Sequence, residues 1–272
     1  MDTPPRTWHR YVAVGDSFTE GLMDADPLRE GAFRGWADRL AELLARHSAR
    51  RGQEFGYANL AVRGLLAADI TGAQLDAALE LSPDLVSLSA GGNDYLRRRV
   101  DPDAITDQVE DAVARVRATG ADVLLLTGPD VSWMPVMHRM QGRMAEFTAS
   151  VWGIAQRHDC YVADIWSLRA LRDRRMFADD RIHFSPEGHQ RVAAQAAWAL
   201  GLSPTKADWA EPLPPAGPLP LLATVAANRE WAHEHLAPWV RRRLAGTSSG
   251  DGITAKRPLI EPLPTASEHP QS

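Results

Sequence analysis

The chain has 272 residues, of which 44% are hydrophobic and 24% charged, as in a globular protein with a sizeable core. A formal net charge of -5 gives it no general affinity for nucleic acid. The single cysteine, Cys160, excludes a disulfide within the chain and a multi-cysteine metal site. Because the N-terminus lacks the apolar stretch of a secretory signal and no run is long enough to span a bilayer, we expect a cytoplasmic protein.

Short apolar runs typical of buried strands alternate with longer amphipathic stretches. The strand candidates are residues 11–14, 57–62, 85–90, 123–127 and 161–165. Apolar side chains recur at helical spacing over residues 36–44, 105–116 and 144–158. This alternation predicts an α/β fold, in which helices cover both faces of a parallel sheet.

A last helix is expected to close a compact domain at residues 1–202. Ser185 suits its N-cap, Pro186 its first position and Gly201 its end. Residues 203–272 read as a proline-rich linker, then one or two helical pieces over 221–244, then a Gly-, Ser- and Pro-rich tail for which disorder is expected. The helical pieces are expected to dock on the domain through Trp231, Leu236, Trp239, Val240 and Leu244.

Polar, glycine-containing turns follow the first three expected strands. In the strand order 2-1-3-4-5, strand two lies on one side of strand one and strands three to five lie on the other. Ligands of open α/β sheets bind at such a switch point, here between strands one and three. Ser17 follows the first strand, Asn59 and Gly64 flank the end of the second, and Asn93 follows the third. We therefore expect these turns to meet in one crevice.

Four motifs in chain order resemble those of the GDSL, or SGNH, hydrolase superfamily. GDSFTEG contains Ser17, NLAVRG contains Gly64, GGND contains Asn93, and DRIHFSPEGH contains Asp180 and His183. The resemblance implies a three-layer α/β/α flavodoxin-like sandwich with the strand order 2-1-3-4-5. This agrees with the five strands expected above, which are followed by a C-terminal extension. The resemblance also implies Ser17 as nucleophile, His183 as base and Asp180 as acid.

These residue types suit the hydrolysis of a carboxylic ester through an acyl-enzyme. A serine hydroxyl is a weak nucleophile until a base takes its proton, which is the role expected of His183 beside Asp180. The expected oxyanion hole consists of the backbone N–H groups of Ser17 and Gly64 and the side-chain amide of Asn93. The chain is therefore expected to be an esterase or lipase that needs no cofactor or metal.

Structural readings of the same residues compete with this hypothesis. Ser17 suits the cap of a short helix, Asn93 an ordinary turn, and His183 packing beside the last helix. Asp179 competes with Asp180 as the acid, although the D-x-x-H spacing favours Asp180. The chain lacks the G-x-S-x-G elbow, the P-loop and the dinucleotide-binding glycine motif, which argues against those enzyme classes.

The substrate is expected to be a small-molecule ester with a small or medium acyl group. Trp133 and Met134, followed by Met137 and Met140, suit an apolar acyl pocket and equally the packing of a loop on the core. Arg63 suits contact with an anionic substrate. O-acetylated sugars or metabolites, thioesters and lipid-like esters all fit the resemblance.

A remote alternative is a non-catalytic flavodoxin-like binding module, against which the complete Ser, Gly, Asn, Asp and His set argues. Neither a nucleic-acid partner nor stable membrane insertion is expected. The sequence leaves the oligomeric state open.

Overall fold

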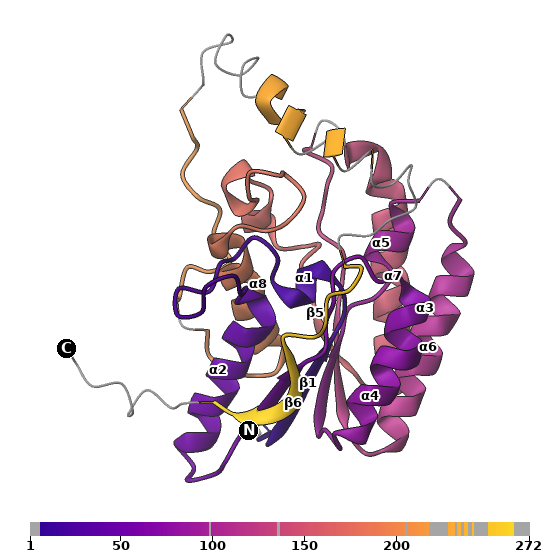
Figure 1. The fold of residues 1–272 in the computed structure, drawn as a ribbon, viewed down its shortest axis with the longest axis vertical. Helices are drawn as coiled ribbons and strands as arrows, with labels where there is room; N and C mark the ends of the chain where they lie inside the picture. The colour runs from indigo at the N-terminus through magenta and orange to yellow at the C-terminus, as the bar shows by residue number, and fades with distance from the viewer. Residues whose placement is uncertain are drawn as a thin grey trace, which may run out of the picture.

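The computed structural model describes residues 6–97, 99–134, 137–204, 206–217, 228–231, 233–234, 237–238, 241 and 250–263. Its strands form one sheet in the order β5-β4-β3-β1-β2-β6 (Figure 1). The strands are β1 (Arg10–Val14), β2 (Gly56–Asn59), β3 (Leu85–Leu88), β4 (Asp122–Leu126), β5 (Tyr161–Ala163) and β6 (Arg257–Pro262). Strands β1 to β5 pair in parallel, and β6 runs antiparallel to β2.

The predicted parallel sheet and its order 2-1-3-4-5 are confirmed. All residues of β3 and β4 are buried, as expected for strands covered by helices on both faces. Tyr11 and Val12 of β1, at the centre of the sheet, are fully buried. The core therefore lies on both sides of the sheet, and the carboxyl ends of the parallel strands meet at one edge.

The helices form two layers. Helices α2 (Gly35–Ala49) and α8 (Pro186–Ala199) pack together on one face, and Figure 1 shows α3, α4, α6 and α7 on the other. The helices of that second layer are α3 (Ala67–Asp69), α4 (Leu75–Glu80), α6 (Pro102–Ala118) and α7 (Gln141–His158). The short elements are α1 (Ser17–Glu20), η1 (Ile70–Gln74), α5 (Gly92–Tyr95), η2 (Met137–Met140), η3 (Arg169–Leu171) and η4 (Arg174–Met176).

The last helix begins where its capping residues predicted. The Ser185 hydroxyl accepts a hydrogen bond from the Gly188 amide at 3.3 Å, and Pro186 is the first helical residue. The helix ends at Ala199, and Gly201 follows in the left-handed region with a φ of 76°.

The prediction of a disordered tail was wrong for residues 257–262, which form β6. The side chains of Ala255, Ile260 and Leu263 pack against the core. Pro258 and Pro262 lack an amide N–H, which an edge strand tolerates because one of its sides has no partner strand. Composition indicated disorder because the tail is rich in residues that rarely form strands, whereas the docking surface comes from β2, far away in the sequence.

Only part of the expected helical segment over 221–244 falls within the described residues. Residues 228–231 are helical, and Trp231 donates from its indole N–H to the Asp180 carbonyl at 2.9 Å. Leu236, Trp239, Val240 and Leu244 lie outside the described part. Within the described ranges, no helix is long and apolar enough to cross a membrane.

Candidate active site

Ser17 is placed by a sharp turn at the carboxyl end of β1. The chain leaves β1 at Val14, passes through Gly15 and Asp16, and enters α1 at Ser17. The Asp16 carboxylate caps α1 by accepting from the Phe18 amide at 3.0 Å. Burial raises the pKa of Asp16 to about 6, although the hydrogen bond from Phe18 acts in the opposite direction.

Asp180 and His183 lie on a compact loop that precedes α8. The loop is closed by a bridge between Phe177 and Phe184 and by a hydrogen bond from the Ala178 amide to the His183 carbonyl at 2.9 Å. One carboxylate oxygen of Asp180 accepts from the His183 amide at 3.0 Å. These bonds hold the two side chains against each other before any substrate binds.

The structure brings Ser17, His183 and Asp180 into one hydrogen-bonded chain. His183 Nε2 lies 3.0 Å from Ser17 Oγ, and His183 Nδ1 lies 2.5 Å from Asp180 Oδ2. Burial alone would raise the pKa of Asp180, but the hydrogen bond and charge of His183 outweigh it and lower that pKa. Asp179 is exposed, so Asp180 is the carboxylate placed to orient the imidazole.

Gly64 lies on the turn after β2, and Asn93 lies in α5, the short helix after β3. Gly64 has a φ of 83°, in the left-handed region that a side chain disfavours. The Asn93 amide donates to Asp16 Oδ2 at 3.1 Å and to the Leu65 carbonyl at 2.9 Å. Asn93 thus ties together the turns after β1, β2 and β3. Both of its N–H groups are engaged, so donating to a ligand requires sharing or exchanging one of these bonds.

A cavity of about 180 Å³ opens beside Ser17 and His183. Its walls are mostly apolar, and Met134, Met137, Met140 and Met144 all line it. The other apolar side chains in the lining are Phe18, Leu22, Ala90, Leu96, Leu126, Pro129, Val131, Phe147, Ile165, Phe177, Ile182 and Phe184. Apolar walls around a few polar groups are typical of a small-molecule site.

Of the three candidate substrate contacts, only one lines the cavity beside Ser17. Met134 lines the cavity. Trp133 is outside the lining and packs on Phe177 at 5.7 Å between ring centroids. Arg63 is also outside it, and its guanidinium Nε lies 3.0 Å from the Glu20 carboxylate. Because the Glu20 carboxylate pairs with Arg63, this guanidinium is not placed to bind an anionic substrate.

Sequence reasoning missed Gln74, the last residue of η1. Its side chain accepts from the Gly15 amide at 2.6 Å and donates to the carbonyls of Gly15 at 3.1 Å and Leu60 at 2.8 Å. Gln74 therefore fixes the backbone two residues before Ser17. In the sequence Gln74 is one of several polar residues in a helical stretch, with Thr71 and Asp76 beside it, so nothing distinguished it.

His189 lines the same cavity from α8. It is 1% exposed, and its ring stacks on Phe18 and meets the edge of Phe184. The Leu22 backbone lies near the ring, although neither ring nitrogen makes a hydrogen bond of ordinary geometry among the described residues. Burial lowers the pKa of His189 to about 3, so the ring is neutral throughout the neutral pH range.

The pH dependence of stability is expected to reveal this neutral histidine. Because the unfolded chain protonates His189 near its ordinary pKa of about 6.5 and the folded chain does not, the free energy of unfolding falls as pH drops below 6.5. At pH 5 the loss from His189 is about 2 kcal/mol. We therefore expect urea unfolding to show that the stability of the wild type relative to His189→Leu is lower at pH 5 than at pH 7 by about this amount.

Comparing the wild type with His189→Leu separates the contribution of His189 from those of the other titrating groups. Burial raises the pKa of Asp16 and Asp38 to about 6, which costs stability as pH rises from about 4 to 6, the opposite trend. Both carboxyls are present in the variant as well. Identical pH dependence in the two proteins would show that folded His189 takes up a proton normally.

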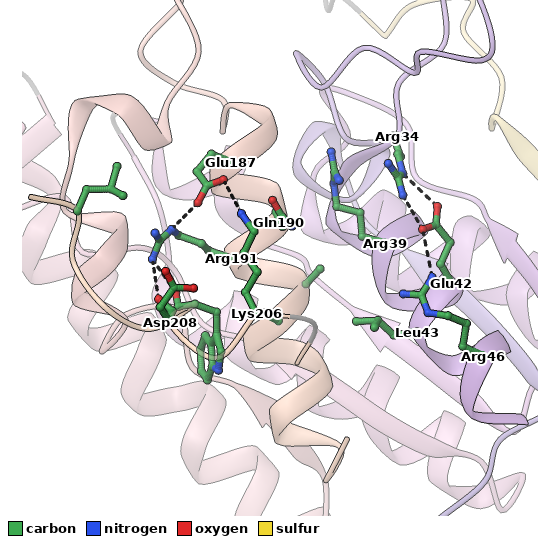
Figure 2. A pocket seen from close by; sticks show the side chains of 14 residues that line it. Arg34, Arg39, Glu42, Leu43, Arg46, Glu187, Gln190, Arg191, Lys206 and Asp208 are labelled. Atoms are coloured by element: carbon green, nitrogen blue, oxygen red, sulfur yellow. Dashed lines mark hydrogen bonds and ion pairs between the residues drawn. The ribbon is translucent and has the colours of Figure 1, made fainter. Parts of the chain in front are cut away.

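A second cavity, of about 360 Å³, lies between α2 and α8 and shares no residue with the first. Figure 2 shows its charged walls, with Arg34 beside Glu42 on α2 and Arg191 beside Glu187 on α8. Its cations are thus already paired with carboxylates. Within the described part of the chain, no group of three or more His, Cys, Asp or Glu side chains is placed to hold a metal ion.

Residues 13–191 match the GDSL-like lipase/acylhydrolase family. A search of curated protein sequences gives no match. Among solved structures, LAE5, described as an alpha/beta hydrolase enzyme from the metagenome of Lake Arreo, Spain, is 27% identical, with 71% of this chain and 95% of that one covered at a TM-score of 0.60. TesA is 26% identical, with 70% and 96% covered and a TM-score of 0.54.

A third similar structure is more distant in sequence. Axe2, an acetylxylan esterase from Geobacillus stearothermophilus, is 19% identical, with 75% of this chain and 100% of that one covered and a TM-score of 0.62. At this identity the likeness concerns the fold. The family match covers more than half of the chain and includes all four sequence motifs. The chain belongs to the GDSL-like lipase/acylhydrolase family and is a hydrolase that acts on ester bonds.

Proposed function

We propose that the domain at residues 1–202 hydrolyses carboxylic esters through an acyl-enzyme formed on Ser17, with His183 as base and Asp180 as the orienting acid. The observation that carries this proposal is the unbroken chain from Ser17 Oγ to His183 Nε2 at 3.0 Å and from His183 Nδ1 to Asp180 Oδ2 at 2.5 Å. A serine that only caps a helix does not require a histidine and a carboxylate hydrogen-bonded in series to its hydroxyl.

The reaction proceeds in two steps, acylation of Ser17 and hydrolysis of the acyl-enzyme. Ser17 Oγ bonds to the acyl carbon as its proton passes to His183 Nε2. The bond from the acyl carbon to the alcohol oxygen then breaks, and His183 returns the proton to the departing alcohol. In the second step, water gives a proton to His183 and attacks the acyl carbon. Ser17 Oγ leaves with that proton, which frees the acid.

The tetrahedral intermediates carry a negative oxygen that needs preorganised donors. We assign these donors to the backbone N–H groups of Ser17 and Gly64 and to the side-chain amide of Asn93. The assignment is supported by the Asn93 bonds to Asp16 and Leu65, which hold the three turns together. As the oxyanion forms, Asn93 exchanges one of these bonds for a charge-assisted one.

The cavity beside Ser17 favours an apolar acyl chain of several carbons. Its methionines and phenylalanines offer dispersion contacts and exclude water. Each additional methylene of the acyl chain buried there therefore strengthens binding by about 0.8 kcal/mol. An acetyl group would leave most of this apolar wall unused. We therefore propose a medium-chain acyl ester or thioester in preference to an O-acetylated sugar.

The test is a series of p-nitrophenyl esters from acetate to dodecanoate, run beside acetylated xylose and an acyl-thioester. We expect kcat/KM to rise from acetate to a medium chain and then fall. A fluorophosphonate should label Ser17, and the label should be located by peptide mass. Labelling of a different residue, or hydrolysis of none of these esters, would overturn the proposal.

Narrowing the cavity is expected to shorten the preferred chain. Met137 lines the cavity and is partly buried, so Met137→Trp fills space there without replacing a fully buried core residue. We expect kcat/KM for the preferred medium-chain ester to fall roughly tenfold or more, the equivalent of about two lost methylene contacts. Acetate hydrolysis by the same variant is the control and should change less than about twofold. An equal loss for both esters would place the acyl chain elsewhere.

A further inference from the structure

Residues 250–263, here called the C-terminal strap, lie against the segments that follow β1 and β2. The end of the strap forms β6 on β2, and Figure 1 shows its yellow loop rising beside α1. The strap is more than 180 positions from the turns after β1 and β2 in the sequence, for example from Arg63 to Gly250. The contacts at its two ends explain what it does there.

Lys256 reaches from the strap into the hydrolase domain. Its ammonium group donates to the carbonyls of Glu20 at 2.6 Å, Phe33 at 2.9 Å and Arg34 at 2.9 Å. It also pairs with the buried carboxylate of Asp38. The side chain is only 13% exposed, although a lysine with three N–H donors is rarely buried unless paired.

The Glu20 carbonyl is the last of α1, the helix that begins at Ser17. The final carbonyls of a helix have no partner within the helix, and a lysine can satisfy them. Just beyond Glu20, Gly21 lies directly on Gly35 at the start of α2, and a Cβ on Gly21 would be 2.5 Å from Gly35 Cα. Lys256 binds carbonyls on both sides of this contact and so fixes α1 against α2.

The other end of the strap touches the turn after β2. Gly250 lies so close that a Cβ on it would be 1.9 Å from the carbonyl oxygen of Arg63, in the peptide that joins Arg63 to Gly64. The Glu20 carboxylate accepts from the Arg63 amide at 2.9 Å, which links this turn back to α1. The strap therefore contacts both segments whose backbone N–H groups are assigned to the oxyanion.

We propose that the C-terminal strap positions the oxyanion hole and that Lys256 is its positioning residue. By holding the end of α1 and the Arg63–Gly64 peptide, the strap sets the Ser17 and Gly64 amides at the spacing that the negative oxygen requires. The inference rests on the proposed function, since it assigns the strap a task in that reaction. It distinguishes the strap from a lid, which would move, and from a wrap that only adds stability.

The test replaces Lys256 by methionine in the full-length chain. Because a small displacement at the reacting centre costs up to about 100-fold in rate, we expect kcat for p-nitrophenyl butyrate to fall roughly 10- to 100-fold with KM nearly unchanged. The affinity for butylboronic acid, which forms a tetrahedral adduct on the serine oxygen, should fall by a similar factor. Both are measured well below the melting temperature of the variant.

Arg257→Met is the matched control on the neighbouring residue of the same strap. Its guanidinium lies over the Tyr57 ring and pairs with Glu261, so its loss should lower Tm and leave kcat unchanged. Should Lys256→Met fail to fold because Asp38 is left buried and unpaired, Lys256→Met with Asp38→Asn removes that charge and supplies the same measurement.

A merely stabilising strap gives a different result. Wild-type kcat and boronate affinity in the Lys256 variants, with only Tm lowered, would overturn the positioning role while fluorophosphonate still labels Ser17. Failure of that label in the wild type would instead overturn the proposed function. The two failures are therefore separate outcomes.

Discussion

Ser17→Ala is expected to lower kcat/KM for the preferred p-nitrophenyl ester by about 10⁴- to 10⁶-fold. Alanine removes the oxygen that bonds to the acyl carbon, and His183 then has no hydroxyl from which to take a proton. The remaining groups still offer a cavity and oxyanion donors, so slow turnover by water above the uncatalysed rate should persist. Initial rates at equal, titrated enzyme concentrations measure the loss.

Ser89→Ala is the matched control for this variant. Ser89 follows β3 and lines the same cavity, but it is not part of the chain from Ser17 to Asp180. We expect its kcat/KM to stay within a few-fold of the wild type. Folding should barely change in Ser17→Ala, since a typical hydrogen bond contributes only about 1 kcal/mol. Comparable rates in wild type and Ser17→Ala would rule out Ser17 as the nucleophile.

The strands and the positions of the turns that carry the candidate site residues were predictable because they depend on local patterns. Apolar runs flanked by glycine and polar residues located β1 to β5, and Ser185 with Pro186 located the start of α8. The order of the strands then brought three turns to one edge. Spacing, amphipathic pattern and turn chemistry predicted these elements, whereas the order of the strands came from the resemblance to the GDSL superfamily.

The contacts that hold these turns in place depend on distant parts of the chain, and no local pattern indicates them. Gln74 is one polar residue in a helical stretch, and its bonds to Gly15 and Leu60 exist only once the sheet has formed. Lys256 lies in a segment whose composition indicates disorder, and its acceptors are backbone carbonyls that any sequence would supply. Arg63 suggested an anion site until the fold placed Glu20 beside it.

Asp180→Asn is expected to lower kcat by about 10³- to 10⁴-fold while leaving KM within a few-fold. The lowered pKa of Asp180 keeps it ionised at neutral pH, so it accepts the Nδ1–H of His183 and leaves Nε2 free to take the Ser17 proton. An asparagine can instead turn its amide N–H toward Nδ1, which favours the tautomer with the proton on Nε2. That tautomer cannot act as the base for Ser17.

Asp179→Asn separates the tautomer effect from the mere loss of a negative charge in this loop. Asp179 is the neighbouring residue, is exposed and lies outside the chain to Ser17, so its variant should keep kcat within about twofold. Fluorophosphonate labelling of Ser17 should slow in Asp180→Asn by a factor similar to the fall in kcat, since both reactions need the same proton transfer. A large loss in Asp179→Asn with normal turnover in Asp180→Asn would mean that Asp179, and not Asp180, orients His183. Losses of equal size in both would mean that the loop contributes its charge and not the orientation of His183.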